Sequence, residues 1–457
     1  MQYFKRLIPA GWPHYSLISC LICFSFLFSS CSLEKKISRS ATIALADSSM
    51  RNAHVGISIY EPATGKYWYN YNAEKYFIPA SNTKIPTCYS AMKYLGDSLV
   101  AGRIELDHDS SVILYPSGDP TFLHPDFKQQ NLFRELQKYS RVDIDFSGFD
   151  EEPLGSGWSW NDYNEDYMAE RSAFPVYGNL VRFDLRNAKP RSIPSVEIIP
   201  NDPQDRKWVE NRITSAYNEK RFRVQRNLNA NKFFIVTTTG SYVPEEIPFR
   251  TDNEFIADVL GDTLKEGHDV FTRSEGPLQY KYRGTVIHSQ PTDSLLKIMM
   301  HRSDNFFAEQ SLLMVSNERL GVMNDNRIID TLLRTDLKDL PQPPRWADGS
   351  GLSRYNLFSP KDFVYILNKM KNEFGMDRIK VILATGGRGT LSSYFLANKD
   401  RIFAKTGTLS GVVALSGFFY TKSDKLLIFS VLVNNHHGSA TGIRRAVEKF
   451  LQNVCNR

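Results

Sequence analysis

Residues 54–71 carry the pattern of a β-hairpin. Residues 54–60 (HVGISIY) and 66–71 (KYWYNY) are rich in β-branched and aromatic side chains, and a Pro-Ala-Thr-Gly turn separates them. The stretch PASNTK at residues 79–84 follows and opens a predicted helix. Pro86 is compatible with that helix, because it falls in the first turn, where few backbone hydrogen bonds are lost.

The C-terminal end mirrors this arrangement. Residues 412–435 predict two long apolar strands joined by a tight turn at residues 422–425, and residues 439–454 predict a closing helix. A hairpin and a helix at each end of the chain are the components of an antiparallel sheet flanked by helices. We therefore expect an α+β fold in which the two ends form one sheet, while the middle of the chain leaves that sheet and returns.

The middle of the chain differs in composition and in its pattern of apolar residues. It contains short predicted strands, such as residues 110–115 and 233–239, many Asn, Asp and Pro residues, and an amphipathic helix beginning at Phe255. A chain of 457 residues is too long for one compact core, so several domains are expected. The predicted division is a signal peptide (1–30), a tether (31–50), a catalytic domain (51–96 and 281–457), a β-rich inserted domain II (97–187 and 246–280) and an inserted domain III (188–245).

The charge balance argues against a nucleic-acid-binding protein. The formal net charge is +6, and it falls to +4 when Lys5 and Arg6 of the leader are left out. One basic cluster in predicted domain III is either a solvated face or a surface for an anionic wall polymer. It consists of Lys220, Arg221, Arg223 and Arg226.

The N-terminus carries the three parts of a secretory signal. Two cations come first, then the apolar run of residues 17–28, then small residues at 29–30. Cys31 follows directly, and LFSSC resembles a bacterial lipobox, in which that cysteine is lipidated. The apolar run is too short and too interrupted for a transmembrane anchor. These features predict an exported, periplasmic protein anchored to the membrane at Cys31, with a soluble secreted form as the alternative.

The cysteines predict no disulfide framework. Removal of the leader leaves Cys31, Cys88 and Cys455, and Cys88 falls on the helix after PASNTK, where a small core residue is expected. No metal-ligand spacing is present, and we expect neither a metal nor a cofactor.

The chemistry is carried by three short motifs. Ser81 and Lys84 form a Ser-x-x-Lys pair, which is weak evidence alone, because the same pattern begins at Ser32, Ser90 and Ser294. Ser81 could equally cap the helix that follows. Ser-Asp-Asn at residues 303–305 and Lys-Thr-Gly-Thr at 405–408 complete an ordered set that is the signature of serine penicillin-recognising enzymes. Taken singly, the second motif could be another helix cap and the third a turn into a strand.

Each residue of the set has a chemical task. Lys84 lies one helical turn after Ser81 and can accept the Ser81 proton if burial or a neighbouring cation lowers its pKa. Lys405 supplies such a cation and can attract a substrate carboxylate. Ser303 can relay a proton to the leaving amine, and the Asn305 amide can hold both Lys84 and a substrate carbonyl.

The third motif also shapes the substrate site. The hydroxyls of Thr406 and Thr408 can assist in binding the carboxylate, and Gly407 allows the substrate backbone to approach the strand closely. The backbone N–H groups of Ser81 and Thr408 are expected to form the oxyanion hole.

With these motifs the chain resembles the D-alanyl-D-alanine carboxypeptidase/endopeptidase family of low-molecular-mass penicillin-binding proteins, whose members carry a large insertion between the first two motifs. The first residues of those motifs, Ser81 and Ser303, are 222 positions apart, far more than in class A β-lactamases. Further similar segments lie at residues 118–120 (GDP), 157–162 (GWSWND), 346–356 (WADGSGLSRYN) and 386–391 (GGRGTL). The resemblance implies a transpeptidase-like (β-lactamase-like) domain with two smaller domains nested in it.

The resemblance also implies a substrate pocket. By position, Asp162 and Arg354 would hold the diaminopimelate side chain of the peptide stem, with Leu352, Leu409 and Ser410 as neighbours. Pro86 and Arg388 depart from the family pattern and affect only local geometry.

The implied activity is that of a serine D-alanyl-D-alanine carboxypeptidase/endopeptidase on peptidoglycan stem peptides, with β-lactam antibiotics as covalent inhibitors. Two alternatives remain open: a β-lactamase or esterase on the same scaffold, and a wall-binding lipoprotein without activity. The complete set of catalytic residues argues against the second alternative.

Overall fold

The computed structural model describes residues 34–108, 110–186, 195–200, 209–210, 223–236, 243–273 and 284–455. The predicted signal peptide and the predicted lipidation site at Cys31 lie outside these ranges, as do Lys220 and Arg221 of the basic cluster. No helix within the described ranges is long and apolar enough to cross a membrane.

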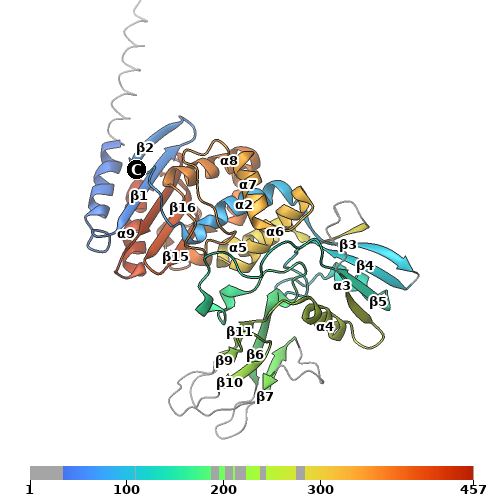
Figure 1. The fold of residues 1–457 in the computed structure, drawn as a ribbon. Coiled ribbons are helices and arrows are strands. Elements are labelled where there is room, and N and C mark those ends of the chain that lie inside the picture. The colour runs from blue at the N-terminus through green and yellow to red at the C-terminus, as the bar shows by residue number, and fades with distance from the viewer. Residues whose placement is uncertain are drawn as a thin grey trace, which may run out of the picture.

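The two ends of the chain meet in one antiparallel sheet (Figure 1), as predicted. Strand β1 pairs with β17, so His54 faces Asn434 across the sheet. The predicted hairpins are confirmed, and the fold class is α+β. The six strands, in sheet order, are β14 (Ala384–Thr385), β15 (Ile402–Leu409), β16 (Val412–Tyr420), β17 (Leu426–Asn434), β1 (His54–Glu61) and β2 (Lys66–Tyr71).

Strands β16 and β17 are apolar at most positions because both faces of the sheet are covered. On β17, Ile428 and Leu432 join one buried cluster, while Phe429 and Val431 join another on the opposite face. The first cluster contains helices α2 (Lys84–Tyr94), α5 (Thr292–Arg302), α6 (Asn305–Leu320), α7 (Asp325–Arg334) and α8 (Pro360–Ile382). The second contains helix α9 (Ala440–Cys455).

The predicted tether is wrong for residues 34–45, which form a helix. Ile37, Ala41 and Ala44 are buried in the same cluster as α9 and the outer face of the sheet. Their spacing of four and three residues places them on one face of a helix. Polar residues occupy most other positions of this segment, so its composition alone did not indicate the short apolar face of a helix.

The inserted region contains three further sheets, drawn away from the six-stranded sheet in Figure 1. The five-stranded sheet has the order β12 (Asp269–Arg273), β5 (Arg141–Asp145), β4 (Ser111–Pro116), β3 (Ser98–His108) and β13 (Thr285–Pro291). The two three-stranded sheets are β11 (Glu245–Pro248), β6 (Leu180–Arg186), β7 (Ser195–Ile199), and β8 (Val209–Glu210), β10 (Phe233–Val236), β9 (Arg223–Arg226). Helices α3 (Asn131–Leu136) and α4 (Asn253–Leu264) accompany them.

Two details of the inserted region differ from expectation. Strand β13 falls within the segment assigned to the catalytic domain, yet it pairs with β3 of the five-stranded sheet. Arg226 was expected on a solvated basic face, but it is 3% exposed, and its guanidinium lies 5.4 Å from the centre of the Tyr163 ring. The division into nested domains is itself still a prediction.

Candidate active site

Ser81 lies in a tight turn that leads directly into α2. The 3₁₀ helix η1 (Ala80–Thr83) contains it, and α2 begins at Lys84. Neither element has a side-chain hydrogen bond at its N-cap, so the interpretation of Ser81 as a helix cap is wrong. Ala80, just before the serine, has φ +48°, a left-handed conformation that L residues adopt at a cost and that recurs at functional sites.

The turn that contains Ser81 is held against the six-stranded sheet by hydrogen bonds and close packing. Asn82 Nδ2 donates to Ser416 Oγ at 2.7 Å, and the Ser416 hydroxyl donates to Ser430 Oγ at 2.8 Å. A Cβ atom on Gly407 would lie 2.7 Å from the Pro79 carbonyl oxygen. Only glycine therefore allows β15 to run this close to the turn that holds Ser81.

Lys84 is fully buried and faces Ser81. Its Nζ lies 3.1 Å from Ser81 Oγ, 2.7 Å from Asn305 Oδ1 and 2.8 Å from the Ser350 carbonyl oxygen. Two of these partners can only accept hydrogen bonds, whereas the serine hydroxyl can also donate. A neutral Lys84 would therefore give its two protons to Asn305 and Ser350 and turn its lone pair toward the Ser81 hydroxyl.

The surroundings of Lys84 favour that neutral form. Burial lowers the pKa of Lys84 from its usual 10.5 to about 8, although nearby Asp348, Glu309 and Asp304 oppose the shift. An amine with this pKa is a competent general base near neutral pH.

Lys405 occupies the other side of the cluster. Its Nζ donates to Ser303 Oγ and to the Thr406 carbonyl oxygen, each at 2.8 Å. Burial, and then the charge of Lys84, hold the pKa of Lys405 well below its usual value. No carboxylate of the described ranges forms an ion pair with Lys405, so a bound anion would supply the counter-charge that favours its ammonium form.

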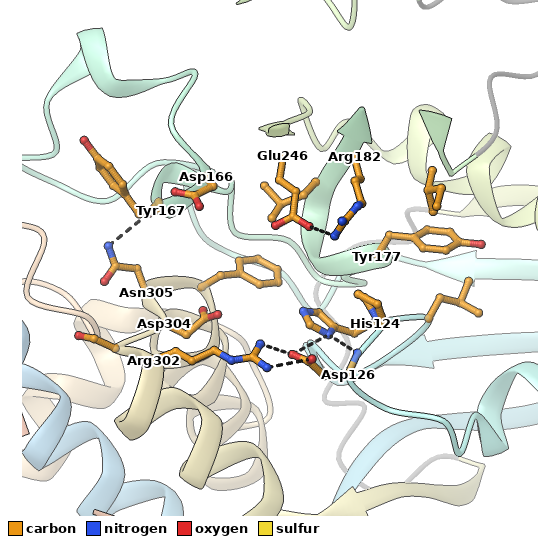
Figure 2. Close-up of a pocket in the computed structure, with 16 residues that line it drawn as sticks. His124, Asp126, Asp166, Tyr167, Tyr177, Arg182, Glu246, Arg302, Asp304 and Asn305 are labelled. Carbon is orange, nitrogen blue, oxygen red and sulfur yellow. Dashed lines mark hydrogen bonds and ion pairs between the residues drawn. The ribbon is translucent and has the colours of Figure 1, made fainter. Parts of the chain in front are cut away.

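The Ser-Asp-Asn segment combines both roles that its sequence suggested. Asp304 caps α6, since its Oδ1 accepts from the Phe307 N–H at 2.9 Å. Ser303 and Asn305 flank this cap and contact Lys405 and Lys84. Asn305 Nδ2 also donates to the Tyr167 carbonyl oxygen at 3.2 Å (Figure 2), which fixes the orientation of its amide.

The Lys-Thr-Gly-Thr segment lies inside β15, so its interpretation as a turn is wrong. Thr406 is half-buried and Thr408 is exposed. Thr408 Oγ1 accepts a hydrogen bond from Arg444 Nη2 of α9. No motif surrounds Arg444 in the sequence, so only the fold reveals this contact.

A buried cluster of charged residues lies next to Lys84 and was not predicted from the sequence. The Glu309 carboxylate accepts from the N–H groups of Gly349, at 3.1 Å, and Ser350, at 2.7 Å, and so fixes the carbonyl that binds Lys84. Arg171 is 1% exposed and lies 3.8 Å from Glu309 and 2.5 Å from Asp325. Burial and Asp348 raise the pKa of Glu309 to about 8. In the sequence, this cluster is indicated only by Glu309, a charged residue among the apolar side chains of α6.

The predicted substrate pocket lies on neighbouring loops. Arg354 Nη2 donates to the Ser410 carbonyl oxygen at 2.7 Å, and the Leu352 N–H donates to Ser350 Oγ at 3.2 Å. Asp162 ends the 3₁₀ helix η2 (Trp160–Asp162) and hydrogen-bonds Tyr167. Burial, and then the charge of Asp162, raise the pKa of the Tyr167 phenol.

The loop that carries Asp162 packs against the loop that carries Arg354. A Cβ atom on Gly157 would lie 2.6 Å from the Tyr355 ring, so the first loop rests on the second. Leu409 ends β15 beside Ser410. The substrate contacts of these residues stay predictions.

Comparison with known proteins places this cluster in a family. The model of the D-Ala-D-Ala carboxypeptidase 3 (S13) family matches residues 38–454. The chain belongs to this family. Two curated relatives are each 26% identical to this chain. They are D-alanyl-D-alanine carboxypeptidase DacB of Haemophilus influenzae (407 residues; 80% of this chain and 82% of the relative) and D-alanyl-D-alanine carboxypeptidase of an Actinomadura species (443 residues; 87% and 80%).

Solved structures share the fold of this chain. Penicillin-binding protein 4 (dacB) of H. influenzae superimposes with a TM-score of 0.70 at 21% identity, covering 92% of this chain and 98% of that one. The same protein complexed with a β-lactam gives a TM-score of 0.65 at 19% identity, with the same coverage.

Proposed function

We propose that this protein is a serine D-alanyl-D-alanine carboxypeptidase and endopeptidase that cuts peptidoglycan stem peptides through an acyl-enzyme on Ser81. The observation that carries the proposal is the buried Lys84 amine, whose two carbonyl partners direct its lone pair at the Ser81 hydroxyl. Membership of the S13 family supports the same reaction, as do the names of both relatives.

Acylation starts when Lys84 accepts the Ser81 proton. The Ser81 oxygen then attacks the carbonyl carbon of the penultimate D-alanine, and the carbonyl oxygen becomes an oxyanion. The N–H groups of Ser81 and Thr408 stabilise that charge, and a single donor of this kind typically contributes about 3 kcal/mol.

The tetrahedral intermediate collapses by breaking the C–N bond. The proton removed from Ser81 returns to the leaving nitrogen, with the Ser303 hydroxyl as relay, so that proton count and charge balance. Free D-alanine leaves in the carboxypeptidase reaction, and a whole stem peptide leaves in the endopeptidase reaction. Water, activated by the same lysine, then hydrolyses the ester.

Lys405 selects substrates that end in a carboxylate. Its buried ammonium acquires a counter-charge only when the carboxylate binds, and the hydroxyls of Thr406 and Thr408 add hydrogen bonds. Asp162 and Arg354 would hold the ammonium and carboxylate of a diaminopimelate side chain, with Leu352, Leu409 and Ser410 around it.

We further propose that the protein is exported and acts on the cell wall from the periplasm, held there by a lipid on Cys31. A Cys31→Ser variant should move from the membrane fraction to the soluble periplasmic fraction. Export without membrane association of the unaltered protein would instead support the soluble form.

Release of D-alanine tests the proposed reaction. The purified protein should release one D-alanine from each pentapeptide stem and should split cross-linked dimers, and a Ser81→Ala variant should do neither. Hydrolysis of penicillin with rapid turnover, and no D-alanine release, would identify a β-lactamase instead.

A further inference from the structure

A pocket of about 670 Å³ adjoins the catalytic cluster (Figure 2). Ser303 and Asn305 line it, although their side chains also contact the two catalytic lysines. Its far wall comes from the inserted region, through Arg182 of β6 and Glu246 of β11. The active site therefore continues into a second compartment, and the proposed reaction as described so far gives this compartment no role.

Two ion pairs line this pocket. Arg302 forms a two-pronged pair with Asp126, and Arg182 Nη1 lies 3.2 Å from Glu246 Oε1 (Figure 2). The side chains of Arg182 and Glu246 are 44% and 38% exposed. Exposed pairs of this kind contribute only about 0–1 kcal/mol to stability, so stability does not explain their placement. Water-accessible charges at a pocket wall can exchange partners with a charged ligand.

The rest of the lining is mixed. It includes the carboxylates of Asp166 and Asp304 together with apolar and aromatic side chains, of which Ile199 is 41% exposed. The apolar and aromatic residues are Leu123, Tyr177, Leu180, Ile199 and Phe306. N-acetylated sugars of a glycan strand are neutral, whereas a peptide stem carries carboxylates and an ammonium group. The combination of paired charges and apolar surface therefore favours the peptide.

We propose that this pocket binds the second stem peptide of a cross-linked substrate, the peptide that leaves when the bond is cut. The proposal rests on the proposed function. Ser303 relays the proton to the leaving nitrogen, so the leaving peptide starts beside Ser303 and extends along the compartment that Ser303 lines. The volume lies within the roughly 300–1,000 Å³ typical of ligand pockets. A single D-alanine does not need such a compartment.

The test compares two substrates in variants of the far wall. Arg182→Ala and Glu246→Ala should each lower kcat/KM for a cross-linked dimer by about 10-fold, mainly through KM, because a charge-assisted hydrogen bond is lost. D-Alanine release from a pentapeptide monomer and acylation by penicillin should stay within about twofold of the unaltered protein. Arg334→Ala is the matched control, since Arg334 also forms an exposed pair, with Asp330 on α7.

Two results would overturn the proposal. Cleavage of the dimer at the normal rate in both variants would show that the pocket does not hold the leaving peptide. Equal losses on dimer and monomer would show that the ion pair only maintains the structure.

A binding measurement separates this proposal from the proposed function. The tetrapeptide stem left by cleavage should bind the Ser81→Ala protein both in this pocket and at the site of Asp162 and Arg354, and Arg182→Ala should weaken only the binding in the pocket, about 10-fold. This holds even if the unaltered protein proves unable to release D-alanine, which would overturn the proposed function alone. Equal binding with and without Arg182 would overturn the pocket.

Discussion

The charges around Lys84 and those of the adjoining pocket lie in opposite environments. Lys84 and Lys405 are 0% exposed and contact fixed partners, whereas Arg182 and Glu246 are 44% and 38% exposed. In the buried cluster, burial shifts pKa values and every charge depends on its neighbours. In the pocket, water screens each pair. Under the proposed mechanism, proton transfer takes place where water is excluded, and substrate selection takes place where a ligand can displace water.

Removing the buried base should have the largest effect. Lys84→Met should reduce the second-order rate of acylation by penicillin at least about 10³-fold, because no other described side chain is placed to accept the Ser81 proton. Stopped-flow measurement with a reporter cephalosporin gives this rate. Lys93→Met is the matched control, since Lys93 lies on the same helix but is partly exposed. Acylation of Lys84→Met within tenfold of normal would place the base elsewhere.

Removing the cation behind the base should mainly affect stability. Arg171→Met leaves Glu309 and Asp325 buried without their partner, and loss of one member of a buried ion cluster costs about 3–5 kcal/mol. Urea unfolding should show this decrease in the free energy of unfolding, while Arg334→Met, in an exposed pair, should change it by less than about 1 kcal/mol. Similar values for the two variants would remove the distinction between the two environments.

The pH dependence of acylation should report the titration of Lys84. The lysine must lose its proton before it can accept one from Ser81, and its pKa is lowered to about 8. The amine fraction thus rises from about one tenth at pH 7 to about nine tenths at pH 9, and the acylation rate should rise roughly ninefold. A rate that is flat or falls over this interval would contradict a lysine base.

Removing the exposed charge of Arg354, next to the lysine–serine cluster, should have the smallest effect. Arg354 is exposed and donates to the Ser410 carbonyl oxygen. Arg354→Ala should reduce kcat/KM about fivefold for stems with diaminopimelate, through the loss of one exposed hydrogen bond to a charged group, and leave stems with lysine nearly unchanged. Equal reductions for both stems would give Arg354 a structural role.

The sequence predicted those features that repeat locally. Strands β1, β2, β16 and β17 follow from apolar patterns and turns, and the lysine–serine cluster follows from three motifs with known chemistry. The helix at residues 34–45 did not follow, because three buried side chains define it within a polar segment.

Contacts between segments that lie far apart in the sequence could not be predicted from it. Arg171 meets Glu309 and Asp325, and Arg444 meets Thr408, only after the chain has folded. The pairing of β13 with β3 could not be predicted for the same reason, since most of the inserted region separates the two strands in the sequence. A pattern within one segment carries no information on such pairing.

The central claim is that Ser81 is the nucleophile activated by Lys84. Intact-protein mass spectrometry after incubation with penicillin tests it most directly, with the modified peptide located by proteolysis. A single lasting adduct on Ser81, absent from Ser81→Ala and strongly slowed in Lys84→Met, is the expected result. An adduct on another residue, or none on the folded protein, would contradict the claim.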